Sequence, residues 1–119
     1  MNLWLDDIRP APAGWVHVRT VEEAKAALLT EEVERASLDH DLGACNECMS
    51  GRTIEQWLQE TGDTAMPHCE HFGTGYTLVC WMEESGHWPR EKPTVHSANP
   101  AGRARMQAVI DREWEKPRG

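Results

Sequence analysis

Short apolar runs recur along the chain, and the first and third of them stop abruptly at acidic residues. The runs are Asn2 to Leu5, Trp15 to Arg19, Ala36 to Asp39 and Thr94 to Ser97. A short apolar run that ends in this way is typical of a buried parallel strand that meets the carboxyl edge of its sheet. The second run alternates between apolar and polar residues, which also fits a strand. The pattern therefore predicts about four strands.

Two capping boxes mark where helices start. Thr20 is followed three residues later by Glu23, which predicts a helix from Val21 to about Glu34. Thr53 and Gln56 have the same spacing and predict a short amphipathic helix in the middle of the chain.

The second half of the chain predicts two further helices. Gly75 to Ser85 is strongly apolar and is followed by Gly86, a residue type that commonly ends a helix. Asn99 and Pro100 form a favoured pair for the start of the last helix. Apolar residues then recur every four positions and mark its inner face. These residues are Met106, Ile110 and Trp114.

The order of these elements predicts one α/β domain over residues 1–119. Short apolar strands that alternate with amphipathic helices favour a small, mostly parallel sheet with helices on both faces. An insertion over residues 44–73 interrupts the alternation. The link between the first two strands, which contains Pro10, Pro12 and Gly14, is short for a parallel crossover. We therefore expect a degenerate first helix there.

Composition and charge narrow the class of partner. The 119 residues amount to one domain, and the net charge is -8 without a basic cluster. This balance disfavours a nucleic-acid duplex or a membrane surface as partner. No run approaches the roughly 18 apolar residues of a membrane span, and no leader pattern precedes the first strand, so we expect a cytoplasmic protein. A phosphate-containing small ligand would need local arginines or a metal ion.

Cysteine and histidine residues cluster in the insertion with a spacing typical of a metal site. Cys45 and Cys48 form a C-x-x-C pair. Cys69 and His71 complete a set of four ligands that structural zinc accepts, and His68 is an alternative to His71. A structural Zn2+ would hold together a segment with little apolar content. Buried thiols without a metal are the alternative.

Polar residues gather directly after three of the predicted strands. They are Asp6, Asp7 and Arg9 after the first strand, Asp39, His40 and Asp41 after the third, and His96, Ser97 and Asn99 after the fourth. In an open α/β sheet these strand ends share the carboxyl edge, where ligands bind. The carboxylates would repel one another there unless a cation lay among them. The alternative is that the acidic residues only cap turns and the histidines are ordinary strand-end residues.

Arg103 and Arg105 lie early in the last predicted helix, where positive charge opposes the helix dipole. An anion bound at the helix N-terminus would offset this cost and would meet free backbone N–H groups. Arg103, one turn into the helix, is better aimed than Arg105. Solvent-exposed surface arginines are the alternative for both.

The strand ends belong to three longer motifs. They are Leu3-Trp4-Leu5-Asp6-Asp7-x-Arg9-Pro10, Ser37-Leu38-Asp39-His40-Asp41-Leu42-Gly43 and Val95-His96-Ser97-x-Asn99-Pro100. Together they resemble the motifs of the cyclic-phosphate processing receiver domains, a family similar to response-regulator receivers. The resemblance implies a flavodoxin-like sheet, in which Asp6 and Asp7 match the metal-binding acidic pair. It also implies that Asp39 matches the receiver phosphoacceptor and Ser97 its strand-end hydroxyl.

The chain also departs from receivers. No fifth strand follows the fourth, and no lysine occupies the usual place of the receiver lysine, because Lys92 precedes the last strand. His40 and His96 are additional to the receiver pattern. The resemblance therefore implies an enzyme of cyclic phosphates or cyclic nucleotides rather than a phosphorelay component.

The strand-end residues and the resemblance together imply a phosphoesterase that hydrolyses cyclic phosphates, such as cyclic nucleotides or cyclic dinucleotides. We expect His40 and His96 to share the general acid and base roles, with Asp39 and Asp7 as further catalytic residues. A divalent ion, Mg2+ or Mn2+, would bind the acidic side chains. The candidate ligands of this ion are Asp6, Asp7, Asp39 and Asp41. The candidate substrate-binding residues are Arg9, Ser97, Asn99 and Arg103.

Three alternatives stay open at this point. A metal-free mechanism would place the two histidines around one phosphate. A degenerate receiver would bind a cyclic nucleotide or a protein partner without turnover, and a zinc-stabilised adaptor would have an acidic edge without a role. The two imidazoles favour an enzyme, because binding alone would prefer arginines.

Overall fold

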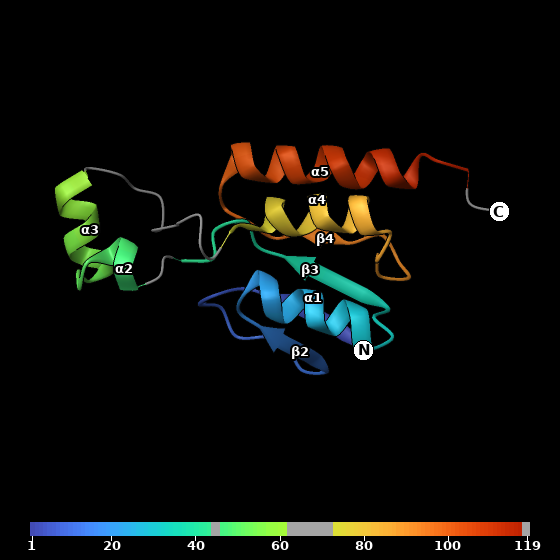
Figure 1. Cartoon of the computed structure of the whole chain (residues 1–119), viewed down its shortest axis with the longest axis horizontal. Helices are drawn as coiled ribbons and strands as arrows, with labels where there is room; N and C mark the ends of the chain where they lie inside the picture. The colour runs from blue at the N-terminus through green and yellow to red at the C-terminus, as the bar shows by residue number, and fades with distance from the viewer. Residues whose placement is uncertain (44–45, 62–72, 118–119) are drawn as a thin grey trace.

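The computed structural model of the chain describes residues 1–43, 46–61 and 73–117. Its strands form one parallel sheet in the order β2-β1-β3-β4 (Figure 1). The strands are β1 (Asn2–Leu5), β2 (Trp15–Val18), β3 (Arg35–Leu38) and β4 (Thr94–Val95). β1 has its predicted bounds, and each later strand ends one or two residues before its predicted end. The predicted parallel α/β sheet is therefore confirmed.

Burial alternates along β1 because successive side chains point to opposite faces of a sheet. Leu3 and Leu5 are fully buried, whereas Asn2 and Trp4 are half-buried. The buried face joins a single core with residues from β3 and from three helices. Its members include Leu38, Ala24, Leu78, Met82, Met106 and Ile110.

The first helix, α1 (Val21–Thr30), begins where the capping box predicts. The Thr20 hydroxyl accepts the N–H of Glu23 at 3.1 Å. The helix ends four residues before the predicted Glu34. The reason is non-local, since Glu34 donates its N–H to the carbonyl of Met1 at 2.8 Å, and Val33 accepts the N–H of Arg90 at 2.9 Å. Strand-like hydrogen bonds thus draw this segment away from the helix.

The two long helices of the second half follow their predicted caps. In α4 (Gly75–Ser85) the chain turns out at Gly86, whose φ of 76° is a left-handed conformation that glycine adopts without strain. In α5 (Pro100–Trp114) the Asn99 side chain accepts the N–H of Gly102 at 3.0 Å. The two helices pack against each other, and of the predicted apolar residues of α5 Met106 and Ile110 are fully buried and Trp114 is partly buried.

The described part of the insertion contains two short helices, α2 (Asn46–Met49) and α3 (Ile54–Thr61). The predicted capping box of α3 is present, because Thr53 and Gln56 each accept the other's backbone N–H, at 3.1 and 2.9 Å. Arg52 joins the two helices, because it donates to the carbonyls of Cys48 and Met49 on α2 and to the Glu60 carboxylate on α3. Figure 1 shows both helices beyond the carboxyl end of the sheet.

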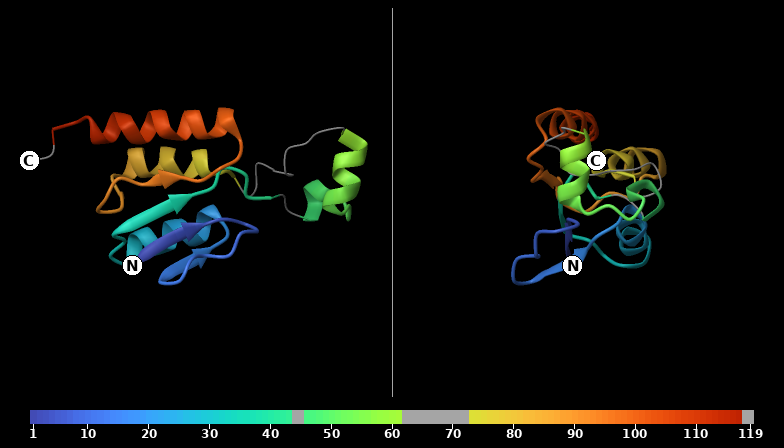
Figure 2. Two further views of the ribbon diagram at one scale, coloured as in Figure 1. Left: turned by 180° about the vertical axis from the view of Figure 1, so that it is seen from behind. Right: turned by 90° about the vertical axis from the view of Figure 1, so that its left-hand side faces the viewer.

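The described helices do not cover both faces of the sheet, which corrects that prediction. Helices α1 and α4 lie on one face, and α5 runs along the β4 edge against α4 (Figure 2). The other face, which we call the open face, presents Trp4, Trp15, His17 and Ser37 in register. A helix between β1 and β2 would cover it, but residues 6–14 form turns and no helix, so the expected degenerate helix is wrong. The prolines and Gly14 in this segment account for the difference.

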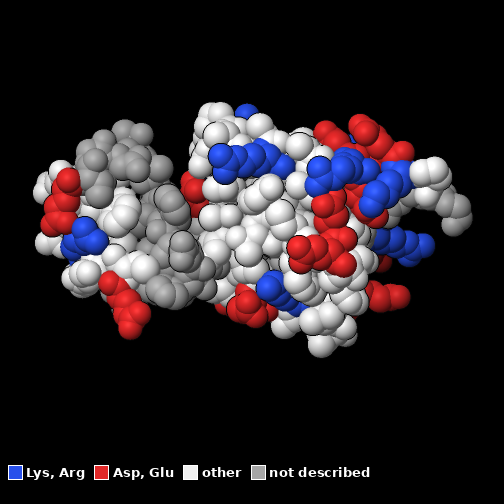
Figure 3. All heavy atoms as spheres, turned by 45° about the horizontal axis from the view of Figure 1, so that its top comes forward, with Lys and Arg blue, Asp and Glu red and all other residues white. Residues whose placement is uncertain are grey.

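Charged side chains are interspersed over the part of the surface around the C-terminal half of α5 (Figure 3). Arg112 donates to Glu83 at 2.7 and 2.8 Å, and Lys116 donates to Glu113 at 2.9 Å. These exposed pairs contribute little to stability, but they offset the positive charge of this helix end. Among the described residues, no helix is long and apolar enough to cross a membrane.

Candidate functional site

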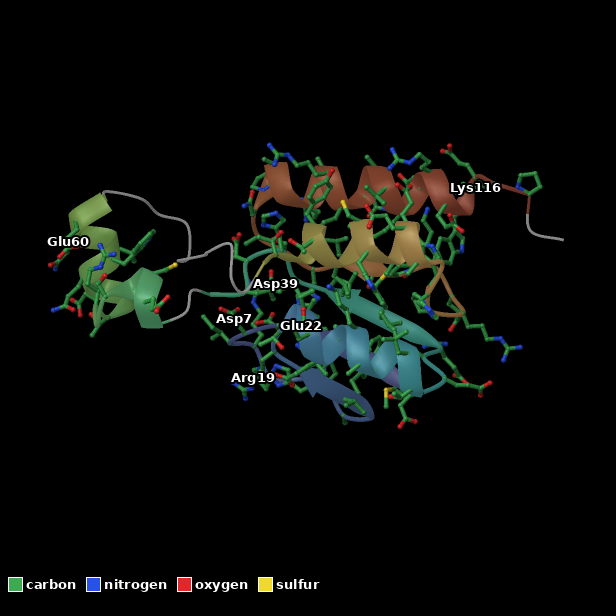
Figure 4. The ribbon with its side chains drawn as sticks, viewed as in Figure 1. Asp7, Arg19, Glu22, Asp39, Glu60 and Lys116 are labelled. Carbon is green, nitrogen blue, oxygen red and sulfur yellow. The ribbon has the colours of Figure 1, made fainter. Side chains whose placement is uncertain are left out.

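Three adjacent strand ends bring the predicted site residues together. Because β1, β3 and β4 are neighbours and run parallel, Asp6, Asp39 and His96 follow them at the same edge. Backbone bonds continue the sheet there: Asp39 donates to the carbonyl of Leu5 at 2.9 Å, and His96 donates to that of Leu38 at 3.0 Å. Figure 4 shows Asp7 and Asp39 close to each other at this edge. The predicted convergence of strand ends is therefore present.

Asp6 is the most buried of the acidic residues, with 1% of its surface exposed. One carboxylate oxygen, Oδ1, accepts the backbone N–H groups of Ile8 and Arg9 at 2.8 Å each. The other, Oδ2, lies 3.0 Å from Nε2 of His96. Burial acts to raise the pKa of Asp6, but these hydrogen bonds outweigh it and leave the pKa below its ordinary value. Asp6 is thus held as a carboxylate.

The pKa values of Asp39 and Asp7 are shifted in the opposite direction, above their ordinary value. Asp39 is 8% exposed, and burial, followed by the nearby charge of Asp6, raises its pKa to about 6. Burial also raises the pKa of Asp7, with repulsion from Asp6 and Asp41 adding to it. Crowded carboxylates of this kind gain stability from a cation placed among them.

His96 is held on three sides. Its Nε2 faces Asp6 Oδ2, its Nδ1 lies 2.8 Å from the Ser37 hydroxyl, and its ring stacks on Trp4 at 4.0 Å with an angle of 6° between the planes. A carboxylate only accepts hydrogen bonds, so Nε2 carries the proton and Nδ1 accepts from Ser37. Both ring nitrogens are therefore engaged within the protein.

His40 has a different environment. Its backbone N–H donates to Asp39 Oδ1 at 2.9 Å, and its ring Nδ1 donates to Asp41 Oδ1 at 2.8 Å. Asn99 also donates to Asp41 Oδ1, at 3.5 Å. The ring lies tightly against Gly102, where a Cβ would come 2.4 Å from His40 Cγ. Among the described residues, Nε2 of His40 has no hydrogen-bond partner, so this nitrogen has a lone pair to offer.

A small pocket of about 200 Å3 lies at this edge. Its lining residues are Asp6, Asp7, Ile8, Arg9 and Asp39. Arg9 crosses its rim, since Nη1 donates to the His96 carbonyl at 3.0 Å and lies 3.8 Å from Asp6 Oδ2. We predicted that the histidines and Asp41 would line the same pocket. Instead, they are connected to it through hydrogen bonds, His96 to Asp6 and His40 to Asp39.

The remaining predicted substrate-binding residues occupy the start of α5. Ser97 is 3% exposed, and its hydroxyl accepts the N–H of Asn99 at 3.1 Å. Asn99 itself caps the helix. Arg103 and Arg105 are exposed surface residues in this structure. The polar groups of Ser97 and Asn99 thus serve the local fold first.

Sequence reasoning missed Trp4 and Ser37, which position His96 from the open face. Each lies two residues before a strand-end aspartate, Asp6 or Asp39. The two-residue period of strands places such residues on the same face as that aspartate. This spacing was the available signal.

One set of residues has the geometry of a metal site. Asp6, Asp39 and His96 each offer a ligand atom, and these atoms lie within 4.8 Å of one another. Asp7 and Asp41, which the sequence favoured as ligands, are not in this group. Asp7 lines the adjoining pocket, and Asp41 binds His40. The predicted zinc site lies mostly outside the described residues, with Cys48 on α2 as its one described ligand.

Comparison with known proteins adds one finding to this geometry. No curated protein and no solved structure matches the chain. A family model described as the cyclic-phosphate processing receiver domain matches residues 1–112, which include all three strand-end motifs and the sheet. The chain therefore belongs to the cyclic-phosphate processing receiver domain family.

Proposed function

We propose that this chain hydrolyses an ester bond of a cyclic phosphate, with a cyclic nucleotide or cyclic dinucleotide as substrate. The observation that carries the proposal is the set of ligand atoms from Asp6, Asp39 and His96 within 4.8 Å of one another. It adjoins the pocket of about 200 Å3 at Arg9. Pockets that enclose a drug-sized ligand measure roughly 300–1,000 Å3. This one suits the phosphate end of a substrate and leaves the remainder outside.

The donor atoms fit a divalent ion. Carboxylate oxygens suit Mg2+ and Mn2+, and an imidazole nitrogen favours transition metals. When bound, such an ion would polarise the phosphoryl group. Asp6 and Asp39 would hold it, and a cation there would relieve the repulsion that raises the pKa of Asp39. The Ser37 hydroxyl can donate or accept, so His96 can move its proton to Nδ1 and free Nε2 as a third ligand.

We assign the proton transfer to His40, because its Nε2 has no hydrogen-bond partner among the described residues. Asp41 accepts from Nδ1, which fixes the ring and leaves Nε2 to take the proton of an attacking water. The water oxygen forms a bond to phosphorus and one ester P–O bond breaks. The leaving alkoxide then takes the proton from Nε2, so the product is a phosphate monoester. In this scheme His96 acts through Asp6 or through the ion, and not directly on the substrate.

Arg9 supplies the positive charge for the substrate. Its guanidinium sits at the rim of the pocket, half-exposed, and keeps donors for a non-bridging phosphate oxygen. Arg103, at the start of α5, would join it only if the substrate extends to that helix. The pairing of Arg9 with the acidic set allows an anion to bind in a chain of net charge -8.

Incubation with a panel of cyclic mono- and dinucleotides, with and without Mg2+ or Mn2+, tests the proposal. We expect conversion of at least one cyclic phosphate to a linear phosphate monoester, followed by phosphorus NMR and by chromatography. Saturable binding without any conversion would favour the degenerate receiver that binds without turnover. If the chain neither binds nor converts any of these ligands, both functions are contradicted.

A structural Zn2+ in the insertion is a separate proposal. Cys45, Cys48 and Cys69 with His71 would hold one ion per chain, and His68 is the alternative fourth ligand. We expect one equivalent of zinc by elemental analysis of purified protein, and less than one in Cys45→Ser. Chelation should loosen residues 44–73 before the sheet. Zinc-free protein that keeps the stability of the native chain would contradict the proposal.

A further inference from the structure

The open face of the sheet carries an aromatic surface that continues directly into the candidate site. Trp4 is edge-on to Trp15, with 6.2 Å between ring centroids, and is stacked on His96. His96 in turn contacts Asp6. The aromatic rings therefore form a row from β2 across β1 to the acidic edge. No described helix lies over this row (Figure 2).

A hollow lies at the far end of the row. It measures about 330 Å3, and Trp15, Arg35 and Thr94 are among its lining residues. Trp15 is paired with Asn2, four residues before Asp6 on β1, which corresponds to about 13 Å along a strand. A ligand whose phosphate lies at Arg9 would place the rest of its body over Trp4 and toward this hollow.

We propose that the open face binds the nucleobase of the substrate, with Trp15 as the stacking residue and Trp4 as the floor beneath the sugar. This inference rests on the proposed function, because it gives the cyclic phosphate a base. Aromatic side chains stack on any base, since every base has a π-face. The Arg35 guanidinium donates its Nε–H to Glu91 at 2.7 Å, and its terminal N–H groups and the Thr94 hydroxyl are the hydrogen-bonding groups for the edge of the base. The acidic pocket of about 200 Å3 is smaller than the roughly 300–1,000 Å3 of a site that encloses a whole ligand, so with the phosphate inside it the base needs a second surface.

The choice of Trp15 over Trp4 for the test follows from the contacts. Trp4 touches His96, so its removal would disturb the phosphate site as well. Trp15 touches Trp4 and no residue of the acidic group among the described contacts. Tyr76, on α4 and 36% exposed, is an aromatic residue on the opposite side of the sheet and serves as the control.

The experiment compares ligands with and without a base. Binding of 2′,3′-cyclic AMP, of 3′,5′-cyclic AMP and of glycerol cyclic phosphate is measured by calorimetry. Turnover of each is measured in parallel. We expect the wild-type chain to bind cyclic AMP more tightly than the base-free ester. Trp15→Leu should reduce this preference about tenfold, the scale of one lost base stack. Trp15→Phe should retain most of it, and Tyr76→Leu should leave it unchanged.

Each outcome decides the inference separately from the proposed function. A wild-type chain with no preference for the base-bearing ligand would overturn it, as would a preference that survives in folded Trp15→Leu. If Trp15→Leu does not fold, as circular dichroism would show, Trp15→Phe decides instead: a preference for the base that is retained there supports the inference, and one that is lost there overturns it. Binding with preference but without hydrolysis would refute the proposed function and leave the base site intact.

Discussion

His40→Ala is expected to lower cyclic-phosphate turnover by about 10²–10⁴-fold, the usual contribution of one general acid–base residue. The reason is geometric. Nδ1 of His40 is fixed by Asp41 at 2.8 Å, and Nε2 has no partner among the described residues. The fold should persist, because the lost ring lies against Gly102 and is not part of the hydrophobic core. Initial rates at saturating substrate measure the loss, and thermal melting checks the fold.

A pair of glutamine variants separates the two histidines. Glutamine can donate an N–H in place of the His96 ring, so His96→Gln should keep part of the hydrogen bond to Asp6 and part of the activity. Glutamine cannot transfer a proton, so His40→Gln should be as inactive as His40→Ala. Equal losses in the two glutamine variants would show that both rings act on the substrate, as the sequence first suggested. Full activity in His40→Ala would remove this residue from the mechanism.

Local signals predicted most of the fold. Thr20, Thr53 and Asn99 each cap a helix through a bond within three residues of the chain, so neighbouring residues determine these starts. The strand bounds followed in the same way from short apolar runs. The end of α1 did not, because a bond from Glu34 to Met1 decides it, and no window of local sequence contains both.

The sequence predicted which residues form the site better than it predicted their hydrogen-bond partners. Three strands that end in polar residues must bring them to one edge once the sheet is parallel, and this holds for Asp6, Asp39 and His96. The partners of each ring nitrogen depend on register and on side-chain direction. Ser37 and Trp4 contact His96 at Nδ1 and on the ring face, whereas the His40 ring binds Asp41 and lies against Gly102. The sequence showed two equivalent histidines, and the packing makes them different.

The open face could not be inferred from the alternation of strands and helices. That alternation normally covers both faces of a parallel sheet. Here the link from β1 to β2 turns in the opposite direction from the later crossovers and has no helix, so one face stays uncovered. In the sequence, the aromatic residues on that face are indistinguishable from ordinary strand residues. Their continuity with His96 exists only in three dimensions.

Asp39→Asn is expected to stabilise the fold at neutral pH and to abolish turnover. In the folded chain the pKa of Asp39 is raised from 3.8 to about 6, which corresponds to roughly 3 kcal/mol at 1.36 kcal/mol per unit. The direction in which stability changes with pH follows from the difference in protons bound by the folded and the unfolded chain. Well below pH 4 the carboxyl is protonated in both states and costs nothing. As the pH rises from about 4 through about 6, the unfolded chain ionises more readily, and native stability falls.

An amide at residue 39 avoids this loss because it carries no charge and can still accept the N–H of His40 through its oxygen. Denaturant unfolding of dialysed protein should therefore give Asp39→Asn a gain of up to about 3 kcal/mol at pH 7.5 and almost none below pH 4. Asp111→Asn is the contrasting control. Its carboxylate accepts from Lys92 at 2.7 Å at the surface, so its loss should bring no gain.

Added Mn2+ should distinguish a functional carboxylate from one that is merely buried. A ligand that binds only the native state stabilises it in proportion to the logarithm of its concentration. Wild-type melting temperature should therefore rise with Mn2+, while that of Asp39→Asn should stay nearly constant, because the variant lacks one of the carboxylates that would hold the ion. Turnover should fall together with this response. A variant that is more stable, still responds to Mn2+ and still hydrolyses the substrate would remove Asp39 from the site, whereas a less stable variant would contradict the raised pKa itself.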